Sequence, residues 1–243
     1  MAVPVEVRYR QEDGDFVQTT LDRVVVAEVA AGLPVRDFRW YKGRRHYSGW
    51  YHATTGDRLI AYESRLELAR ILLADFARGV VGIAAQPFQV TADDGGRSRR
   101  HVPDLLLVHA DGLVTVVDVK PPDRAREAKF VEQFAWMRRL CLLRGWNFEV
   151  WSGADPVVVE NVRFLAGYRR RFVVESQLFP EVLQAARGQG CVGGIERALA
   201  AQHSVELVRP ALLHLVWSGV LTVDLSRPLG TRTPVRLAEE VAG

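Results

Sequence analysis

The stretch RRHVPDLLLVHADGLVTVVDVK, Arg99–Lys120, contains two apolar runs separated by a turn. The runs over 102–109 and 113–120 have the length and β-branched content of strands. Asp111-Gly112 between them is a turn signal, so the stretch predicts an antiparallel hairpin. Three residues with side chains suited to catalysis or metal binding lie toward its open end: Asp104, Asp118 and Lys120.

The length of the turn decides whether the acids meet. A two-residue turn would place Asp104 opposite Val119 and direct Asp118 to the other face, because side chains alternate along a strand. A three-residue loop beginning at Ala110 would instead place Asp104 opposite Asp118. Hairpin loops of this length with a glycine in the left-handed region are common. We therefore predict the longer loop, or an equivalent bulge.

Carboxylates at the ends of neighbouring strands, with a lysine beside them, suit phosphodiester chemistry. Magnesium prefers oxygen ligands and keeps several of its waters, and Asp104 and Asp118 can supply such oxygens. Lys120 lies two residues beyond an acid and projects to the same face, where it can orient an attacking water and stabilise phosphate charge. A helix expected to begin near Glu63 offers a third acid, either Glu63 or Glu67, and spacing alone leaves that choice open.

The expected elements follow one another as in a mixed α/β domain. They are strands over 3–9, 80–90, 102–109, 113–120 and 147–151, and helices over 63–79, 124–144 and 156–171. The composition changes after about residue 172, and helices over 179–187, 195–203 and 210–218 then precede a small hairpin. We expect a first domain over 1–172, in which 1–37 is a strand and loop extension, and a winged-helix-like domain over 173–243.

Composition excludes several classes of protein. Of the 243 residues, 48% are hydrophobic and 25% charged, a globular balance that excludes a disordered chain, a collagen-like fibre and a disulfide-dense scaffold. No apolar run approaches the ~18 residues of a membrane span, and no signal-peptide pattern is visible. The two cysteines, Cys141 and Cys191, are too few for a Cys-rich zinc site and are expected to be reduced thiols. We expect a cytoplasmic protein without a membrane partner.

The net charge of +3 is too small to indicate a nucleic-acid partner by itself, but the basic residues are clustered. Basic groups interleaved with aromatic rings suit a polyanion whose bases or sugars can stack. We predict DNA contacts by two clusters: Arg39, Lys42, Arg44 and Arg45 in the first, and Arg99, Arg100 and His101 in the second. For His101, a structural role is an equally good interpretation.

The motifs resemble those of a known group of nucleases. Glu63, Pro103-Asp104 and Asp118-Val119-Lys120 resemble the E…PD…(D/E)xK pattern of restriction-endonuclease-like nucleases. The words YESRLELARILLADF, QPFQV, RRHVPDLLLV and VVDVKPP together resemble the TnsA-like endonuclease subunit of heteromeric transposases. The C-terminal RPALLHLVWSGVLTVDLSRPLGTRTPV resembles the winged-helix-like tail of that group.

The resemblance implies a restriction-endonuclease-like mixed sheet flanked by helices, and a DNA endonuclease that cuts the 5′ ends of the transposon in cut-and-paste transposition. Its implied partners are double-stranded DNA of the transposon ends, a TnsB-like DDE transposase and a TnsC-like AAA+ ATPase regulator. By motif position, Glu63, Asp104 and Asp118 would be ligands of Mg²⁺, with Mn²⁺ as a substitute, and Lys120 the catalytic lysine.

Some points stay open at this level. Asp118 is an aspartate where many related nucleases use glutamate, and its shorter side chain leaves its role as a ligand open. Gln133 lies where some related nucleases carry a Q-x-x-x-Y element, but the last position here is Met137, so no role is assigned to it. Two other functions are compatible with the sequence: a stand-alone nuclease of the same fold in DNA repair or phage defence, and a non-catalytic DNA-binding or assembly subunit.

Overall fold

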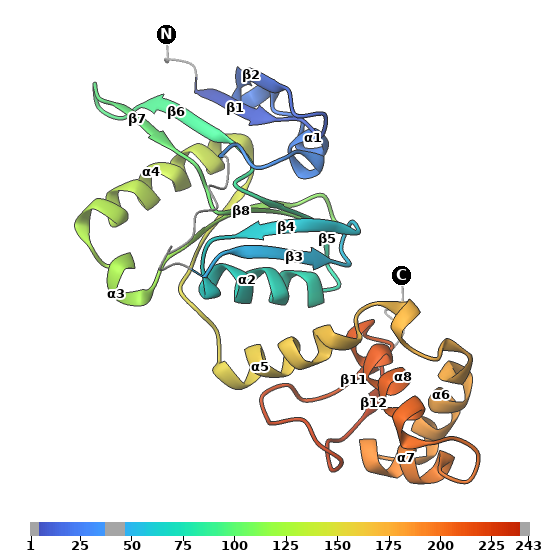
Figure 1. The fold of residues 1–243 in the computed structure, drawn as a ribbon. Helices are drawn as coiled ribbons and strands as arrows, with labels where there is room; N and C mark the ends of the chain where they lie inside the picture. The colour runs from blue at the N-terminus through green and yellow to red at the C-terminus, as the bar shows by residue number, and fades with distance from the viewer. Residues whose placement is uncertain (1–4, 37–46, 239–243) are drawn as a thin grey trace. The chain divides into compact units, whose positions relative to one another are not determined.

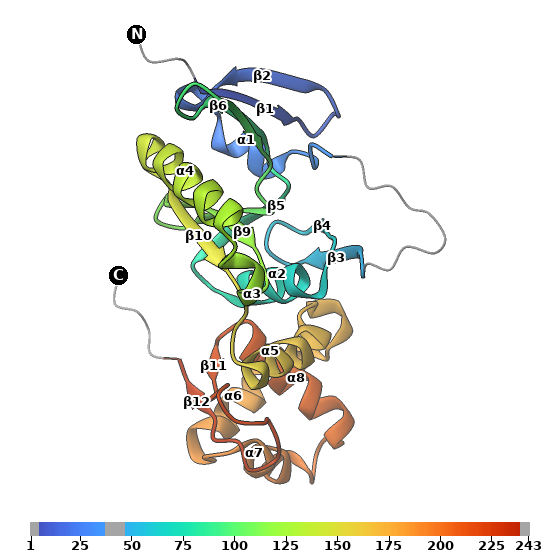
Figure 2. The same cartoon turned by 90° about the vertical axis from the view of Figure 1, so that its left-hand side faces the viewer.

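The computed structural model describes residues 5–36 and 47–238 of the chain (Figures 1 and 2). The chain divides into two compact units, Met1–Gly153 and Ala154–Gly243. The first unit is a mixed α/β structure, as expected, and the second is mainly helical. Each unit is described by itself.

A four-stranded sheet forms the centre of the first unit. Its order is β10 (Asn147–Trp151), β9 (Val114–Val119), β8 (Leu105–His109) and β5 (Val80–Ala85). Strands β9 and β10 are parallel, whereas β8 runs antiparallel to both β9 and β5. Every residue of β9 is buried, which explains why its sequence is apolar except for Thr115 and one acid, Asp118.

A second four-stranded sheet joins the N-terminus to the middle of the chain. Its order is β2 (Phe16–Thr20), β1 (Glu6–Arg10), β6 (Gln89–Asp93) and β7 (Ser98–His101). The strand predicted over 80–90 is therefore two strands in two different sheets, because Pro87 and the left-handed backbone of Gln86 (φ +44°) interrupt it. The segment predicted as an extension, 1–37, supplies two strands of this sheet and so belongs to the first unit.

Helices and a hairpin surround the central sheet. They are α1 (Val26–Ala31), the hairpin β3 (Gly49–Ala53) and β4 (Arg58–Tyr62), α2 (Arg65–Phe76), α3 (Pro122–Ala125) and α4 (Ala128–Arg144). Helix α2 packs against β5, β9 and the β3–β4 hairpin (Figure 1). The helix predicted over 124–144 is interrupted before α4, which ends at Gly145 in the left-handed conformation expected of a C-terminal stop.

Helix α4 joins the two sheets through one hydrophobic core. Its buried side chains Trp136, Met137 and Cys141 pack in the same cluster as Val116 of the central sheet and Val7 of the second sheet. Burial raises the pKa of Cys141 to about 12, and neither cysteine forms a disulfide, so Cys141 acts as a packing residue. The core fixes β9, the strand that carries Asp118, against α4.

The second unit contains α5 (Pro156–Leu165), α6 (Phe179–Gly188), α7 (Val192–Leu199), α8 (Val205–Trp217) and the two-residue strands β11 (Leu221–Thr222) and β12 (Arg236–Leu237). The domain boundary predicted at 172 lies inside it. Helix α5 belongs to this unit because Asn161 donates to the carbonyls of Leu225 and Arg227 at 2.9 and 2.8 Å and accepts from the Leu229 amide at 3.3 Å.

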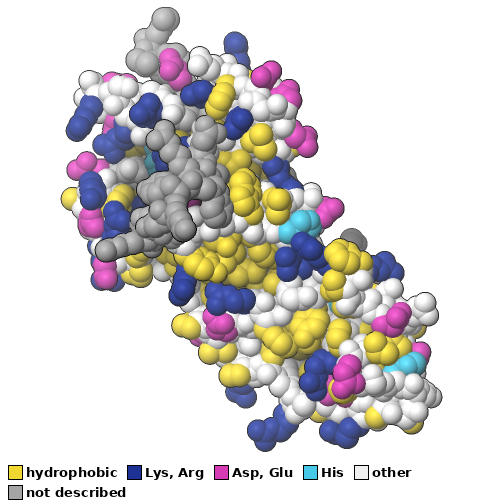
Figure 3. All heavy atoms as spheres, in the orientation of Figure 1, with side chains coloured by type: hydrophobic (Ala, Val, Ile, Leu, Met, Phe, Trp, Pro, Cys, Tyr) yellow, Lys and Arg dark blue, Asp and Glu magenta, His cyan; other side chains and the backbone are white. Residues whose placement is uncertain are grey.

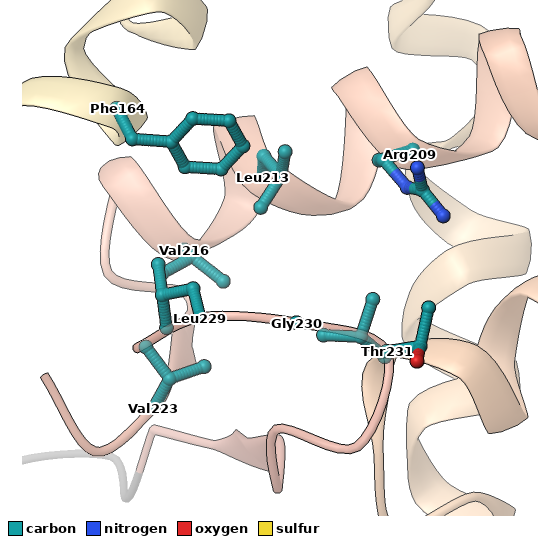
Figure 4. A pocket seen from close by; sticks show the side chains of 9 residues that line it. Phe164, Arg209, Leu213, Val216, Val223, Leu229, Gly230 and Thr231 are labelled. Atoms are coloured by element: carbon teal, nitrogen blue, oxygen red, sulfur yellow. The ribbon is translucent and has the colours of Figure 1, made fainter. Parts of the chain in front are cut away.

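The start of α8 differs from the prediction of a helix that begins at Pro210. The helix begins at Val205, and Pro210 lies inside it, since burial of Val208 and Ala211 holds the turn on both sides of the proline. The apolar residues after Pro210 form the core of the unit. An apolar pocket lies beside α8, with Phe164 and Leu213 at one side and Arg209 at an end (Figure 4). Among the described residues, no helix has both the length and the apolar character needed to cross a membrane.

Candidate active site

The β8–β9 hairpin has the register that brings its acids together. The His109 amide donates to the Leu113 carbonyl at 2.8 Å, and Gly112 in the intervening loop has φ +84°. Leu105 pairs with Val117, and the Asp104 amide donates to the Val117 carbonyl at 3.0 Å. The three-residue loop is thereby confirmed, and Asp104 lies opposite Asp118, as predicted.

Asp104 is held against the end of β9. Its Oδ2 accepts a 2.6 Å hydrogen bond from the Val119 amide and lies 3.8 Å from the ammonium of Lys120. Burial raises the pKa of Asp104 above its ordinary value of 3.8; Lys120 opposes this shift, and the nearby charge of Asp118 adds to it. An ionised Asp104 is thus costly in the folded protein unless positive charge comes close.

Lys120 is one of three cations that lie around the ring of Phe130. The Lys120 amide donates to the Trp151 carbonyl at 3.0 Å, which fixes its backbone to the end of β10. Its ammonium lies 5.5 Å from the ring centroid of Phe130, and Arg124 and Lys129 lie 5.2 and 5.0 Å from the same ring. Three positive side chains around one aromatic face form a surface that favours an anion.

Asp118 is turned toward a histidine. Both of its oxygens lie within 2.9 Å of His101 Nε2, and its side chain has no exposed surface. Gln133 Nε2 lies 2.9 Å from His101 Nδ1. With the amide donating to Nδ1, the imidazole carries its proton on Nε2 and donates it to Asp118. This Gln133–His101–Asp118 chain satisfies a fully buried carboxylate and gives His101 a structural role.

The structure separates the two candidate acids of α2. Glu67 Oε2 accepts from the Glu63 amide at 2.8 Å, and its Oε1 accepts from the Ser64 hydroxyl at 2.9 Å. The Ser64 oxygen in turn accepts from the Glu67 amide at 3.0 Å. This is a capping box, and burial raises the pKa of Glu67. Glu67 thus holds the start of the helix, and the nearby charges of Asp104 and Glu63 also raise its pKa. Glu63 as the third acid of the site stays a prediction.

Substitutions of Glu67, in the first turn of α2, and of Glu63, which precedes the helix, are expected to have different effects. Glu67→Ala removes the capping box and should reduce stability by about 1 kcal/mol, with little change in the cleavage rate of the folded protein. Glu63→Ala should leave the melting temperature nearly unchanged and reduce cleavage by about 100-fold. Thermal melting and a strand-cleavage assay on both variants check this, and a large loss of cleavage for Glu67→Ala alone would reverse the assignment.

Gln86 contacts both the side chain of Glu63 and the backbone of Asp104. Gln86 Nε2 donates to Glu63 Oε2 at 3.2 Å, and the Gln86 amide donates to the Asp104 carbonyl at 2.9 Å. Gln86 Oε1 is buried without a hydrogen-bond partner. The sequence left Gln86 with two alternatives, an approach to the site from the preceding strand or a loop-capping role, and gave Gln133 no role. The available signals were the QPFQV word and the position of Gln133 one helix after the lysine, and neither fixes a contact.

The donor set fits a hard, hydrated cation. Asp104, Glu63 and the orphaned Gln86 Oε1 are all oxygen donors, and Mg²⁺ is usually held by one or two carboxylates while it keeps several waters. Over residues 5–36 and 47–238, no group of three or more His, Cys, Asp or Glu side chains is arranged to hold a metal ion. The ligand roles of Glu63, Asp104 and Asp118 therefore remain predictions, and the contacts of Asp118 with His101 set it apart from the other two.

The predicted DNA-binding residues differ in whether the structure describes them and in how exposed they are. Arg39, Lys42, Arg44 and Arg45 lie outside the described residues. Arg99 is paired with Asp94 at 3.0 Å and lies 3.7 Å from Glu132, whereas Arg100 is exposed on β7. Figure 3 shows Lys and Arg side chains, mixed with acidic ones, along the side of the first unit where α3 and α4 lie. Arg124, Arg126 and Lys129 on this side were not among the predicted contacts.

Part of the first unit matches a known protein family. A family model described as TnsA-like endonuclease N terminal matches residues 78–153. The matched segment contains Gln86, Asp104, Asp118 and Lys120, whereas Glu63 precedes it. No curated protein matches the chain. The match supports a nuclease of the TnsA-like type, carried by the segment that forms the central sheet and α4.

Proposed function

We propose that this chain is the metal-dependent DNA endonuclease subunit of a heteromeric transposase, cutting the 5′ ends of the transposon in cut-and-paste transposition. One observation carries the proposal: Asp104 lies opposite Asp118, and the Lys120 ammonium is 3.8 Å from Asp104. This arrangement lies in the segment that matches TnsA-like endonucleases. A carboxylate and a lysine at adjoining strand ends are suited to phosphodiester hydrolysis.

The proposal extends to the folds of the two units. A restriction-endonuclease-like fold for the first unit is supported by its central mixed sheet with α2 and α4 packed against it. A winged-helix-like fold for the second unit is supported by the antiparallel pair β11–β12, which follows α8. TnsB-like and TnsC-like proteins are the proposed partners, and duplex DNA of the transposon ends is the proposed substrate.

The residues of the site divide the chemistry between them. Asp104 and Glu63 would hold Mg²⁺ or Mn²⁺, which when bound lowers the pKa of water and neutralises charge on phosphate oxygens. The Lys120 ammonium orients the attacking water and adds positive charge beside the scissile phosphate. Asp118 raises the pKa of Asp104 through its own negative charge, so it favours a cation at the site, and it is the third proposed ligand.

The duplex is held by phosphate contacts beside Lys120. Arg124, Arg126 and Lys129, which we call the α3–α4 basic surface, are exposed and follow directly on the catalytic lysine. Glu127 lies 2.9 Å from Lys129 and 3.7 Å from Arg124, and it is the nearby acid that keeps these cations together in the free protein. Contacts of this kind position a duplex and carry little sequence information, so target choice falls to the partner proteins.

Substitutions on the α3–α4 basic surface are expected to weaken DNA binding without regard to sequence. The double variant Arg124→Ala, Lys129→Ala should bind duplex DNA about tenfold more weakly and reduce the slope of log affinity against log salt by about 2. Titration of labelled duplexes of two unrelated sequences at several salt concentrations measures both quantities. Arg78→Ala, at an exposed arginine just beyond the far end of α2 from Glu63, is the control away from this surface, and it removes one positive charge where the double variant removes two. Equal losses for the control and the double variant would refute this surface.

A nicking assay tests the proposed function. The substrate is a duplex that carries a transposon end, with Mg²⁺, and the chain is added alone or with its TnsB-like and TnsC-like partners. We expect weak cutting by the chain alone and efficient cutting at the 5′ end with the partners. Strong cutting of a defined site without partners would instead indicate a stand-alone nuclease. Normal transposition by a chain that carries Asp104→Ala and Lys120→Ala would indicate a non-catalytic assembly subunit.

A further inference from the structure

Gln86 has a backbone conformation that glutamine rarely adopts. Its φ is +44°, and in the described part of the chain the other non-glycine residue with positive φ is Asp57. Asp57 is exposed in the turn between β3 and β4, whereas Gln86 is only 5% exposed. A buried side chain on a strained backbone persists where the surroundings over-determine it, and such positions cluster at functional sites.

The contacts of Gln86 show what holds its backbone in this conformation. The residue stands at the point where the chain leaves β5 and the central sheet and continues to β6 in the second sheet. Its amide donates to the Asp104 carbonyl at 2.9 Å, and its carbonyl accepts from the Val35 amide at 3.1 Å. Its side-chain amide donates to Glu63 Oε2 at 3.2 Å. One residue therefore links the backbone that carries Asp104 to the carboxylate of Glu63.

The remaining atom of this side chain has no partner. Gln86 Oε1 is buried, and within residues 5–36 and 47–238 no donor reaches it. The orientation of the amide is fixed by its neighbour, because the reverse orientation would place the oxygen against a carboxylate oxygen of Glu63. Buried acceptors are nearly always satisfied, by ordered water where the protein offers no donor. The unsatisfied Oε1 and the Nε2 that donates to Glu63 therefore belong to one amide group.

We propose that Gln86 is a positioning residue for the divalent cation, an inference that rests on the proposed function. Its Nε2 orients Glu63, and its Oε1 accepts a hydrogen bond from a water of the hydrated cation. Mg²⁺ retains several waters when it is bound by one or two carboxylates, so the site needs acceptors for the protons of those waters. The left-handed backbone keeps the amide group at this point between β5 and β6.

Cation binding by shortened glutamine variants tests this proposal. Gln86→Asn suits a left-handed backbone and retracts the amide by one methylene, and Gln89→Asn on β6 is the control with the same chemical change. Calorimetric titration with Mg²⁺ and with Mn²⁺ should show binding about 10–100-fold weaker for Gln86→Asn and unchanged for the control. Thermal melting verifies that each variant is folded. Gln86→Met, which preserves the length of the side chain and removes the amide, should show the same loss.

A split between two cleavage parameters distinguishes positioning from general damage. The Mg²⁺ concentration for half-maximal cleavage should rise for Gln86→Asn by the same factor as the dissociation constant, while the rate at saturating Mg²⁺ changes less. A lower rate at every Mg²⁺ concentration with unchanged cation affinity would overturn the inference, as would wild-type affinity in both Gln86 variants. Absence of cation binding by the wild-type chain would refute the proposed function itself, and the role of Gln86 with it.

Discussion

Replacing Lys120 with alanine is expected to reduce the rate of strand cleavage by about 1,000-fold in the reconstituted system. The ammonium lies 3.8 Å from Asp104 and 5.5 Å from the Phe130 ring centroid, where it can reach both the attacking water and the phosphate. Its removal leaves the backbone bond from the Lys120 amide to the Trp151 carbonyl in place. The loss should therefore appear in the chemical step, with the fold preserved.

The matched control for this substitution is Arg138→Ala. Arg138 is an exposed cation of α4 that lies 5.9 Å from the Phe148 ring, so its removal changes the net charge equally. Single-turnover cleavage at saturating protein separates binding from chemistry. The two variants should melt at similar temperatures and differ by about 1,000-fold in rate. Similar rates would mean that Lys120 contributes only to the general positive field.

Asp104→Asn is expected to abolish cleavage, with a reduction of at least about 1,000-fold, and at the same time to stabilise the cation-free protein. Burial raises the pKa of Asp104, so the ionised carboxylate destabilises the folded state at neutral pH. Asparagine retains an oxygen that can accept from the Val119 amide and removes the buried charge. A higher melting temperature together with lost activity is the signature of a ligand held ready for a cation.

Added Mg²⁺ should reverse this order of stability. A ligand at 100 times its dissociation constant stabilises the folded state by about 2.7 kcal/mol, and the wild type should gain this while Asp104→Asn does not. Asp111→Asn is the control, since Asp111 lies at the tip of the same hairpin and its carboxylate accepts from the Leu113 amide at 3.0 Å. An equal Mg²⁺-dependent shift of melting temperature in wild type and Asp104→Asn would exclude Asp104 as a ligand.

The register of the hairpin could be predicted from the sequence because two local rules agree. Strand alternation requires Asp104 and Asp118 to share a face if they act together, and a glycine at position 112 suits a three-residue loop. Strand β10 and the end of α4 at Gly145 were likewise predictable from apolar runs and from glycine at a helix C-terminus. These features depend on residues close together in the chain.

The features that sequence reasoning missed depend on distant residues. The role of Glu67 at the start of α2 required the capping contacts to be observed, although Ser64 and Glu67 have the spacing of a capping box. The contact of Asp118 with His101 depends on how β7, in the second sheet, reaches the end of β9. The role proposed for Gln86 depends on its left-handed backbone, which its sequence context does not predict. The placement of α5 in the second unit depends on the bonds of Asn161, which cross more than sixty residues, to Arg227.

The central claim is that this chain hydrolyses DNA through a divalent cation held beside Asp104 and Lys120. The most direct test is the cleavage of an end-labelled transposon-end duplex by the chain with its partners, with Mg²⁺ present or removed by a chelator. The account predicts a cut on the strand that ends at the transposon 5′ end, lost on chelation and restored by added Mg²⁺. The same cut without any divalent cation, or by the partners without this chain, would contradict it.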